Sequence, residues 1–155
     1  MQTDTTCFFT GHREIPPESY NHIYQLVLYN IQNLYKQGIT DFVCGGALGF
    51  DTLGANAVLE AKQTLDIKLH LVLPCADQSK AFTSEQKLEY ERIKQQADSV
   101  EVLFDHYTRG CMHTRNRKMV DLSCCGIAYC LKTTGGSAYT VKYAILNNLP
   151  VYFVK

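Results

Sequence analysis

Several short stretches of the chain combine glycines with residues that can bind anions or hydroxyl groups. The clearest is VCGGALGFD, residues 43–51, where an apolar run meets Gly45, Gly46 and Gly49 and ends at Asp51. Glycines let backbone N–H groups approach a ligand closely, and an anion is favoured where such a turn opens a helix. The spacing GGxxG matches neither the dinucleotide fingerprint GxGxxG nor the phosphate loop GxxxxGK[ST].

Asp51 argues against a loop that binds phosphate alone. An ionised carboxylate at a helix N-terminus competes with a phosphate for the same helix dipole. We therefore interpret the glycines as room for a ligand, and Asp51 as an acceptor of hydrogen bonds from groups such as ribose hydroxyls. The alternative is that Asp51 only caps the helix that follows.

A second set of candidates lies in TGHR, residues 10–13. Thr10 and Gly11 end an apolar run, and the glycine allows close approach of a ligand to the backbone. His12 supplies a hydrogen-bond donor, and Arg13 supplies a permanent cation suited to phosphate or carboxylate oxygens. The alternative is a solvated loop whose arginine merely precedes a helix.

Two later stretches add cations and hydroxyl groups. Basic side chains cluster in residues 105–118, although the 15 basic and 15 acidic residues of the whole chain balance. Among them we expect Arg115 to contact an anion, because it lies at the start of a helix, one turn before Met119. A second glycine pair opens the last predicted helix. The candidate ligand contacts there are Gly135, Gly136, Ser137 and Thr140.

The composition limits the classes of protein to be considered. Zero net charge argues against a protein that coats nucleic acid or anionic membranes through its overall field. No run approaches the ~20 apolar residues of a membrane span, and the first residues do not resemble a signal peptide. The seven cysteines include no CxxC pair and lie mostly in apolar runs. We predict a cytoplasmic protein with reduced cysteines and no metal site, and Cys75 as a thiol without an evident base.

Short β-branched or aromatic runs alternate with longer helical patterns from end to end, without a linker or repeat. This alternation predicts a Rossmann-like three-layer α/β/α sandwich with a mostly parallel sheet of about six strands, in one domain over residues 1–155. The predicted strands are 6–10, 41–44, 68–73, 99–104, 126–131 and 151–154. The predicted helices cover 18–37, 53–61, 112–120 and 138–145, and one more begins at the Thr-x-x-Gln capping box of Thr83. Loops at the carboxyl ends of parallel strands share one edge, so we expect the candidate residues to meet there.

Four motifs, TGHR, GGALGFD, the M-x-x-R-N-x-x-M-V-D run of residues 112–121 and GGSAYTVKYA, together resemble the YpsA-like family of the SLOG superfamily. That superfamily also contains the DprA/Smf proteins and the LOG-type phosphoribohydrolases. The resemblance extends from Thr10 to the last strand. It implies a Rossmann-like fold with a pocket for a nucleotide or a nucleotide-derived ligand. LOG-type members cleave the base from a nucleoside monophosphate, and DprA-type members bind single-stranded DNA.

One departure from the LOG pattern bears on catalysis. LOG-type enzymes carry PGGxGTxxE, whose glutamate is needed for the N-glycosidic chemistry. Here Thr134 precedes the glycine pair, and Val141 and Lys142 occupy the positions where the glutamate could fall. Arg115 does match the arginine of the LOG pattern. The catalytic residues are therefore unknown, with Asp51 and Arg115 as candidates, and binding without turnover is favoured.

The leading hypothesis is a protein that binds an ADP-ribose-like ligand or a nucleoside phosphate, as a sensor or regulator. One alternative is a LOG-like N-glycosidase acting on nucleoside monophosphates. Another is DprA-like binding of single-stranded DNA; neutral net charge counts against it, whereas Tyr107, Tyr139 and the basic residues 109–118 favour it. No cofactor beyond the nucleotide-like ligand is predicted. The sequence leaves the oligomeric state open, a homodimer included.

Overall fold

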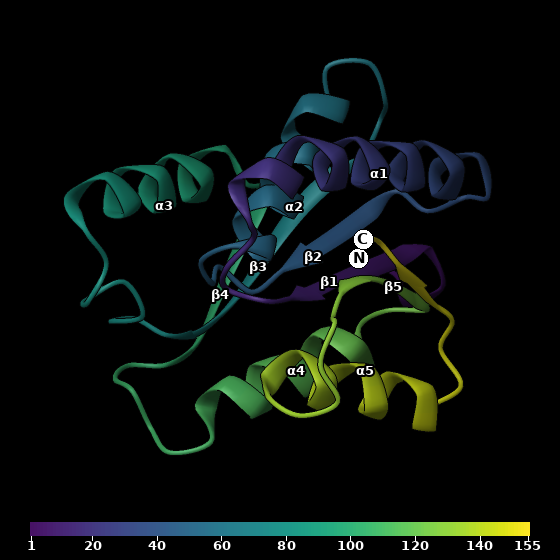
Figure 1. Cartoon of the computed structure of the whole chain (residues 1–155). Helices are drawn as coiled ribbons and strands as arrows, with labels where there is room; N and C mark the ends of the chain where they lie inside the picture. Colours follow the sequence, from purple (N-terminus) through teal and green to yellow (C-terminus); the bar gives the residue numbers. More distant parts are fainter.

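The computed structural model describes residues 1–155 and shows a six-stranded sheet with helices on both faces (Figure 1). The strands are β1 (Thr6–Gly11), β2 (Asp41–Cys44), β3 (Lys68–Cys75), β4 (Ser99–Phe104), β5 (Cys125–Tyr129) and β6 (Val151–Phe153). Their order is β4-β3-β2-β1-β5-β6, and every neighbouring pair is parallel. The predicted Rossmann-like three-layer fold is confirmed.

Five α-helices connect the strands, and a short 3-10 turn (Thr3–Thr5) precedes the first strand. The helices are α1 (Pro17–Lys36), α2 (Phe50–Ala61), α3 (Ser84–Gln96), α4 (Cys111–Asp121) and α5 (Gly136–Leu146). Figure 1 shows α1, α2 and α3 on one side of the sheet and α4 and α5 on the other. None of these helices combines the length and the apolar character that crossing a membrane requires.

Local sequence signals account for the start of α3 but not for the ends of two strands. The predicted capping box forms at α3: Thr83 Oγ1 accepts from the Gln86 N–H, and Gln86 Oε1 accepts from the Thr83 N–H. The third strand is longer than predicted, because it passes Pro74 and Cys75 still pairs with Phe104 of β4. The fifth strand is shorter and ends at Tyr129, where its pairing with β1 ends.

The core has two parts because successive strand residues point to opposite faces of the sheet. Phe9 packs with Phe42 and Phe50 under α1 and α2, in the larger cluster. Its neighbour Phe8 packs on the other side, in the smaller cluster that includes Met119. All seven cysteines are free, and five of them are buried.

The strand order creates a switch point between β1 and β5. From β1 the chain adds β2, β3 and β4 on one side, then returns to place β5 and β6 on the other. The loops that follow β1 and β5 therefore diverge at the carboxyl edge of the sheet. In open parallel sheets, ligands bind in the crevice that such a divergence opens.

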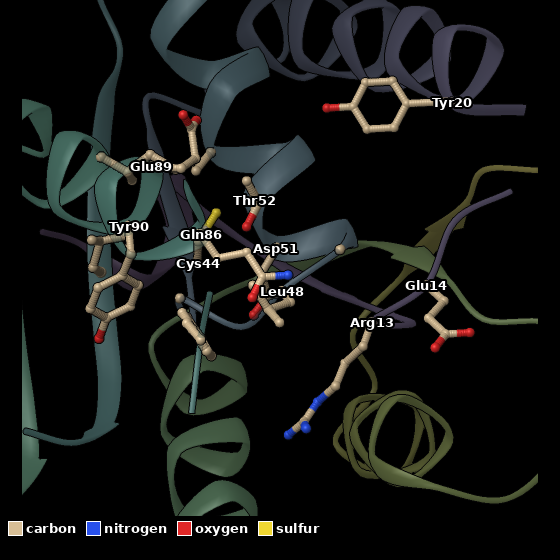
Figure 2. Close-up of a pocket in the computed structure, with 16 residues that line it drawn as sticks. Arg13, Glu14, Tyr20, Cys44, Leu48, Asp51, Thr52, Gln86, Glu89 and Tyr90 are labelled. Atoms are coloured by element: carbon tan, nitrogen blue, oxygen red, sulfur yellow. The ribbon is translucent and has the colours of Figure 1, made fainter. Parts of the chain in front are cut away.

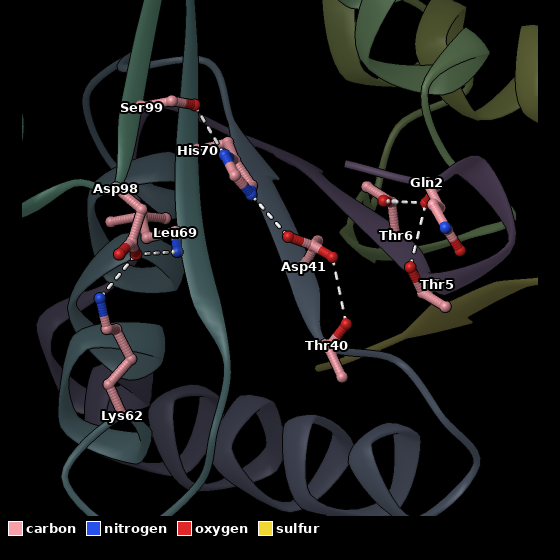
Figure 3. A network of polar contacts seen from close by, with 10 residues as sticks. All are labelled: Gln2, Thr5, Thr6, Thr40, Asp41, Lys62, Leu69, His70, Asp98 and Ser99. Atoms are coloured by element: carbon pink, nitrogen blue, oxygen red, sulfur yellow. Dashed lines mark hydrogen bonds and ion pairs between the residues drawn. The ribbon is translucent and has the colours of Figure 1, made fainter.

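The amino edge of the sheet carries a network of polar side chains (Figure 3). His70 Nε2 lies 2.7 Å from Asp41 Oδ1, and His70 Nδ1 lies 2.6 Å from Ser99 Oγ. Beside it, Lys62 Nζ donates to Asp98 Oδ2 at 2.6 Å. These contacts join the starts of β2, β3 and β4, at the opposite end of the strands from the glycine loops.

Candidate functional site

A cavity of about 480 Å³ opens at the switch point, and we call it the β1–β5 cavity. Most of the predicted ligand contacts line it. They are Thr10, Gly11, His12, Arg13, Asp51, Arg115, Gly135, Gly136 and Ser137. Gly46 and Gly49 line a neighbouring cavity instead, and Gly45 and Thr140 line neither cavity.

Arg115 is the most deeply buried cation of the β1–β5 cavity, with 4% of its surface exposed. Its Nε donates to Asn116 Oδ1 at 2.7 Å, and its guanidinium also donates to the carbonyl oxygen of Gly45. None of these acceptors is charged, and Arg115 forms no ion pair. Burial lowers the pKa of Arg115, and the nearby charge of Asp51 opposes that shift. The site thus holds a buried positive charge without a contacting carboxylate.

Gly45 makes room for this arginine. A Cβ atom at Gly45 would lie 2.5 Å from Arg115 Nη1, so any side chain at this position would displace the guanidinium. Gly49 has a similar function between two loops, because its Cβ would lie 2.2 Å from the carbonyl oxygen of Arg13. The Phe50 N–H donates to the His12 carbonyl oxygen at 3.0 Å. The glycines of the loop between β2 and α2 therefore bring α2, the TGHR loop and Arg115 together.

Asp51 lies in the first turn of α2, whose N-cap is Gly49. The carboxylate is 5% exposed, and its Oδ2 accepts from the Ala47 N–H at 3.2 Å. Burial raises the pKa of Asp51, while Arg115 and the backbone N–H groups of its own loop oppose the shift. Asp51 lines both cavities, so its carboxylate can accept hydrogen bonds from a ligand that enters either one.

His12 joins the loops that follow β1 and β5. The Leu131 N–H donates to His12 Nε2 at 2.7 Å, so the neutral ring carries its proton on Nδ1. That nitrogen lies 3.3 Å from Ser137 Oγ, at the start of α5. Burial lowers the pKa of His12, and the positive charge of Lys132 adds to the shift. His12 is therefore a neutral group that fixes the geometry of the switch point.

The N-terminus of α5 opens into the β1–β5 cavity. Gly135 is the N-cap with φ +103°, and no side chain caps the helix. No heavy atom lies within 4 Å of a Cβ built on Gly135 or Gly136, so both glycines are open to a ligand. The first N–H groups of an uncapped helix lack partners and attract anions. Thr140 lies behind them, fully buried, and its hydroxyl donates to the Gly136 carbonyl oxygen at 2.9 Å.

Four polar residues of this cavity were not among the predicted ligand contacts: His113, Asn116, Lys132 and Thr134. Lys132 is exposed in the loop after β5, and its position just beyond a predicted strand was a usable signal. Asn116 holds Arg115, a contact that no spacing indicates. Cys75 lies outside both cavities, and burial raises its pKa to about 11, so its thiol stays protonated at neutral pH.

A second cavity, of about 490 Å³, lies beside the first, and we call it the α2–α3 cavity (Figure 2). Half of its lining residues are apolar or aromatic, and they come from α1, β2, α2, β3, α3 and the loops before α2 and α3. Arg13 and Asp51 line both cavities, so the two meet at these residues.

The sequence profile of the YspA SLOG family matches residues 9–147. The chain belongs to this family. The predicted YpsA-like, SLOG-type membership is confirmed, and the match includes every candidate residue of the site.

Two solved structures are similar to this SLOG chain. DNA processing protein A from Helicobacter pylori, described for its single-stranded DNA binding mode, has a TM-score of 0.66 and 23% identity, over 97% of this chain and 65% of that one. DNA processing protein A from Streptococcus pneumoniae has a TM-score of 0.70 and 17% identity, over 97% and 50%. The SLOG chain thus spans between half and two thirds of these proteins, and the likeness concerns the fold. No curated protein matches it in sequence.

Proposed function

We propose that this protein binds a nucleotide or a nucleotide-derived ligand, with the phosphate in the β1–β5 cavity. The observation that carries the proposal is Arg115, a buried guanidinium without a carboxylate in contact. Removing a charge from water is costly unless an opposite charge compensates it. A phosphate oxygen beside Arg115 would supply that compensation and accept a charge-assisted hydrogen bond.

Three further groups support an anionic ligand. The uncapped N-terminus of α5 presents free N–H groups to the cavity. Arg13 and Lys132 are exposed at its rim, and neither forms an ion pair. The Ser137 hydroxyl, 3.3 Å from His12 Nδ1, lines the cavity and can donate to a ligand oxygen, and Asp51 can accept from a ribose hydroxyl.

The expected activity is reversible binding, as in a sensor or regulator. The residue types of the cavity suit recognition of phosphate and sugar, and the glutamate of the LOG pattern is absent from the loop that opens α5. Buried Asp51 is the one carboxylate that lines the β1–β5 cavity. Without a second carboxylate in this cavity, cleavage of the base has little support.

Calorimetric titration with AMP and ADP-ribose tests the proposal. We expect saturable binding that weakens several-fold in Lys132→Ala, because the variant removes one exposed cation near the phosphate. Lys36→Ala is the matched control, since Lys36 is an exposed lysine at the far end of α1 and should leave the affinity unchanged. If neither nucleotide binds the wild-type protein, the proposal fails.

Binding of single-stranded DNA is a second candidate, favoured by aromatic groups near the rim of the β1–β5 cavity. The rings of His113 and Tyr139 stack with centroids 4.1 Å apart, and Arg117 Nη1 donates to the Tyr139 hydroxyl at 2.8 Å. Aromatic rings beside cations are typical of proteins that bind single strands. Fluorescence anisotropy with a labelled oligothymidine should then show binding that falls steeply with salt and is lost in Tyr139→Ala. An affinity for the oligothymidine that is the same in Tyr139→Ala as in the wild type would argue against this candidate.

A further inference from the structure

We propose that the α2–α3 cavity holds the base of the ligand, so that one nucleotide occupies both cavities. This inference rests on the proposed function, because it takes the phosphate to lie in the β1–β5 cavity. It adds that the base lies on the α2–α3 side of Arg13 and Asp51, and the phosphate on the β1–β5 side.

The two cavities differ in charge. Basic side chains outnumber acidic ones around the β1–β5 cavity, where Arg115 and Lys132 lie. Among its lining residues the α2–α3 cavity has the opposite balance, since Glu14 and Glu89 join Asp51 there and Arg13 is the only lining cation, while Glu89 is paired with Arg92 outside the lining. Carboxylates repel a phosphate in a partly buried site. An uncharged part of the ligand is therefore favoured in the α2–α3 cavity.

The lining of the α2–α3 cavity suits a flat ring. Tyr20 of α1, Phe82 before α3 and Tyr90 of α3 all border it. The rings of Phe82 and Tyr90 meet edge to face, with centroids 5.6 Å apart and an angle of 88°. Figure 2 shows Tyr20 and Tyr90 on opposite sides of Asp51 and Thr52. Aromatic side chains bind planar bases by stacking or edge contacts.

A free amide group adds a polar contact for such a ring. Gln86 lines the cavity, and its Oε1 accepts from the Thr83 N–H at 2.8 Å. The capping box thus fixes the orientation of this side chain and leaves Nε2 without a protein acceptor. That nitrogen can donate to a ring nitrogen or carbonyl of a base. Apolar pockets with a few placed polar groups are typical ligand sites.

The position of the shared residues matches the order of groups in a nucleotide. Asp51 lies where the cavities meet, between the aromatic rings on one side and Arg115 on the other. A ribose at this point would present its hydroxyls to the Asp51 carboxylate. The inferred ligand class is therefore a base-bearing nucleotide such as AMP or the adenosine half of ADP-ribose, rather than a sugar phosphate alone.

Calorimetry with AMP and with ribose 5-phosphate separates the two cavities, because the second probe lacks the base. We expect AMP to bind the wild-type protein at least about tenfold more tightly, in line with the value of stacking one base. Equal affinities would overturn the base assignment and leave the phosphate site standing. If neither probe binds, the proposed function itself is overturned, and this inference with it.

Two variants test the assignment within the cavity. Tyr20→Ala removes a ring that is 42% exposed, and Tyr29→Ala removes an exposed ring of the same helix away from the cavity. Ala55→Leu adds a side chain that projects from α2 into the cavity. We expect Tyr20→Ala and Ala55→Leu to reduce the affinity for AMP several-fold without changing that for ribose 5-phosphate, and Tyr29→Ala to change neither. An unchanged preference for AMP in both cavity variants would overturn the assignment, and thermal unfolding verifies that Ala55→Leu is folded.

Discussion

Both edges of the sheet bury charged side chains, but the two edges differ in the partners that these side chains contact. At the amino edge, Asp41, His70 and Ser99 form an unbroken chain of contacts, each 2.7 Å or shorter (Figure 3). At the carboxyl edge, Arg115 contacts only neutral acceptors, and Arg13 extends from its loop without an ion pair (Figure 2).

This difference separates a stabilising network from the proposed binding site. A buried polar group that has its partners within the protein contributes to folding, and removing one partner leaves the other unsatisfied. A buried cation whose partner is not part of the protein contributes little to folding, and its interaction is completed by a ligand. The amino edge should therefore respond to mutation mainly in stability, and the carboxyl edge mainly in affinity.

The largest effect is expected from Asp41→Ala. The variant leaves the buried His70 without its acceptor, so the free energy of unfolding should fall by about 2–3 kcal/mol, which lowers the melting temperature by roughly 5–10 °C. Urea denaturation measures the first quantity and calorimetry the second. Asp66→Ala, at an exposed position without an ion pair, is the control. A loss of AMP affinity in Asp41→Ala without a loss of stability would contradict the division between the edges.

Arg115→Met should give the reverse result. We expect the affinity for AMP to fall by roughly tenfold to a hundredfold, the value of hydrogen bonds to a charged group. The melting temperature should change little, because methionine fills much of the space and Gln78 Nε2 still donates to the Gly45 carbonyl oxygen at 3.3 Å. A variant that unfolds readily yet binds AMP normally would place Arg115 among the stabilising residues.

Asp51→Asn should change how the stability of the protein depends on pH. Burial raises the pKa of Asp51, so the folded protein keeps this proton to a higher pH than the unfolded chain does. Ionisation of Asp51 therefore costs stability, and the cost grows as the pH rises from the ordinary aspartate pKa of about 4 through the raised value. The wild-type protein should lose stability relative to Asp51→Asn as the pH rises above about 4. Urea denaturation across this range measures the difference, and a wild type that gains relative stability would contradict the raised pKa.

Salt should have the smallest effect. An increase from about 50 mM to about 500 mM NaCl should weaken AMP binding several-fold, because Arg13 and Lys132 are exposed and screened by ions. The destabilisation caused by Asp41→Ala should stay the same, since its contacts are buried. Titrations and denaturation curves at the two salt concentrations give both numbers. An affinity that does not depend on salt would argue against a charged ligand.

Sequence reasoning was most successful where the information is local. Hydrophobic periodicity predicted the alternation of strands and helices, and the Thr83 capping box predicted the start of α3. The parallel topology then predicted that TGHR, Asp51, Arg115 and the second glycine pair would share one edge, and the structure brings them together.

The details that depend on contacts between distant segments could not be predicted. We expected Gly45 to approach a ligand, and the structure places the Arg115 guanidinium against it, 70 residues further along the chain. Thr140 was included for its hydroxyl, and its helical position turns that hydroxyl inward. The α2–α3 cavity was also missed, because it exists only where α3 is packed beside α2.

The contact between Gly45 and Arg115 has a consequence for comparing related sequences. Any side chain at position 45 would occupy the space of the guanidinium, so a relative that loses this glycine cannot keep the arginine in the same place. The two positions should therefore change together during evolution. In a related sequence, the presence of both residues would indicate that the proposed anion site is retained, and the loss of either would indicate that it is absent.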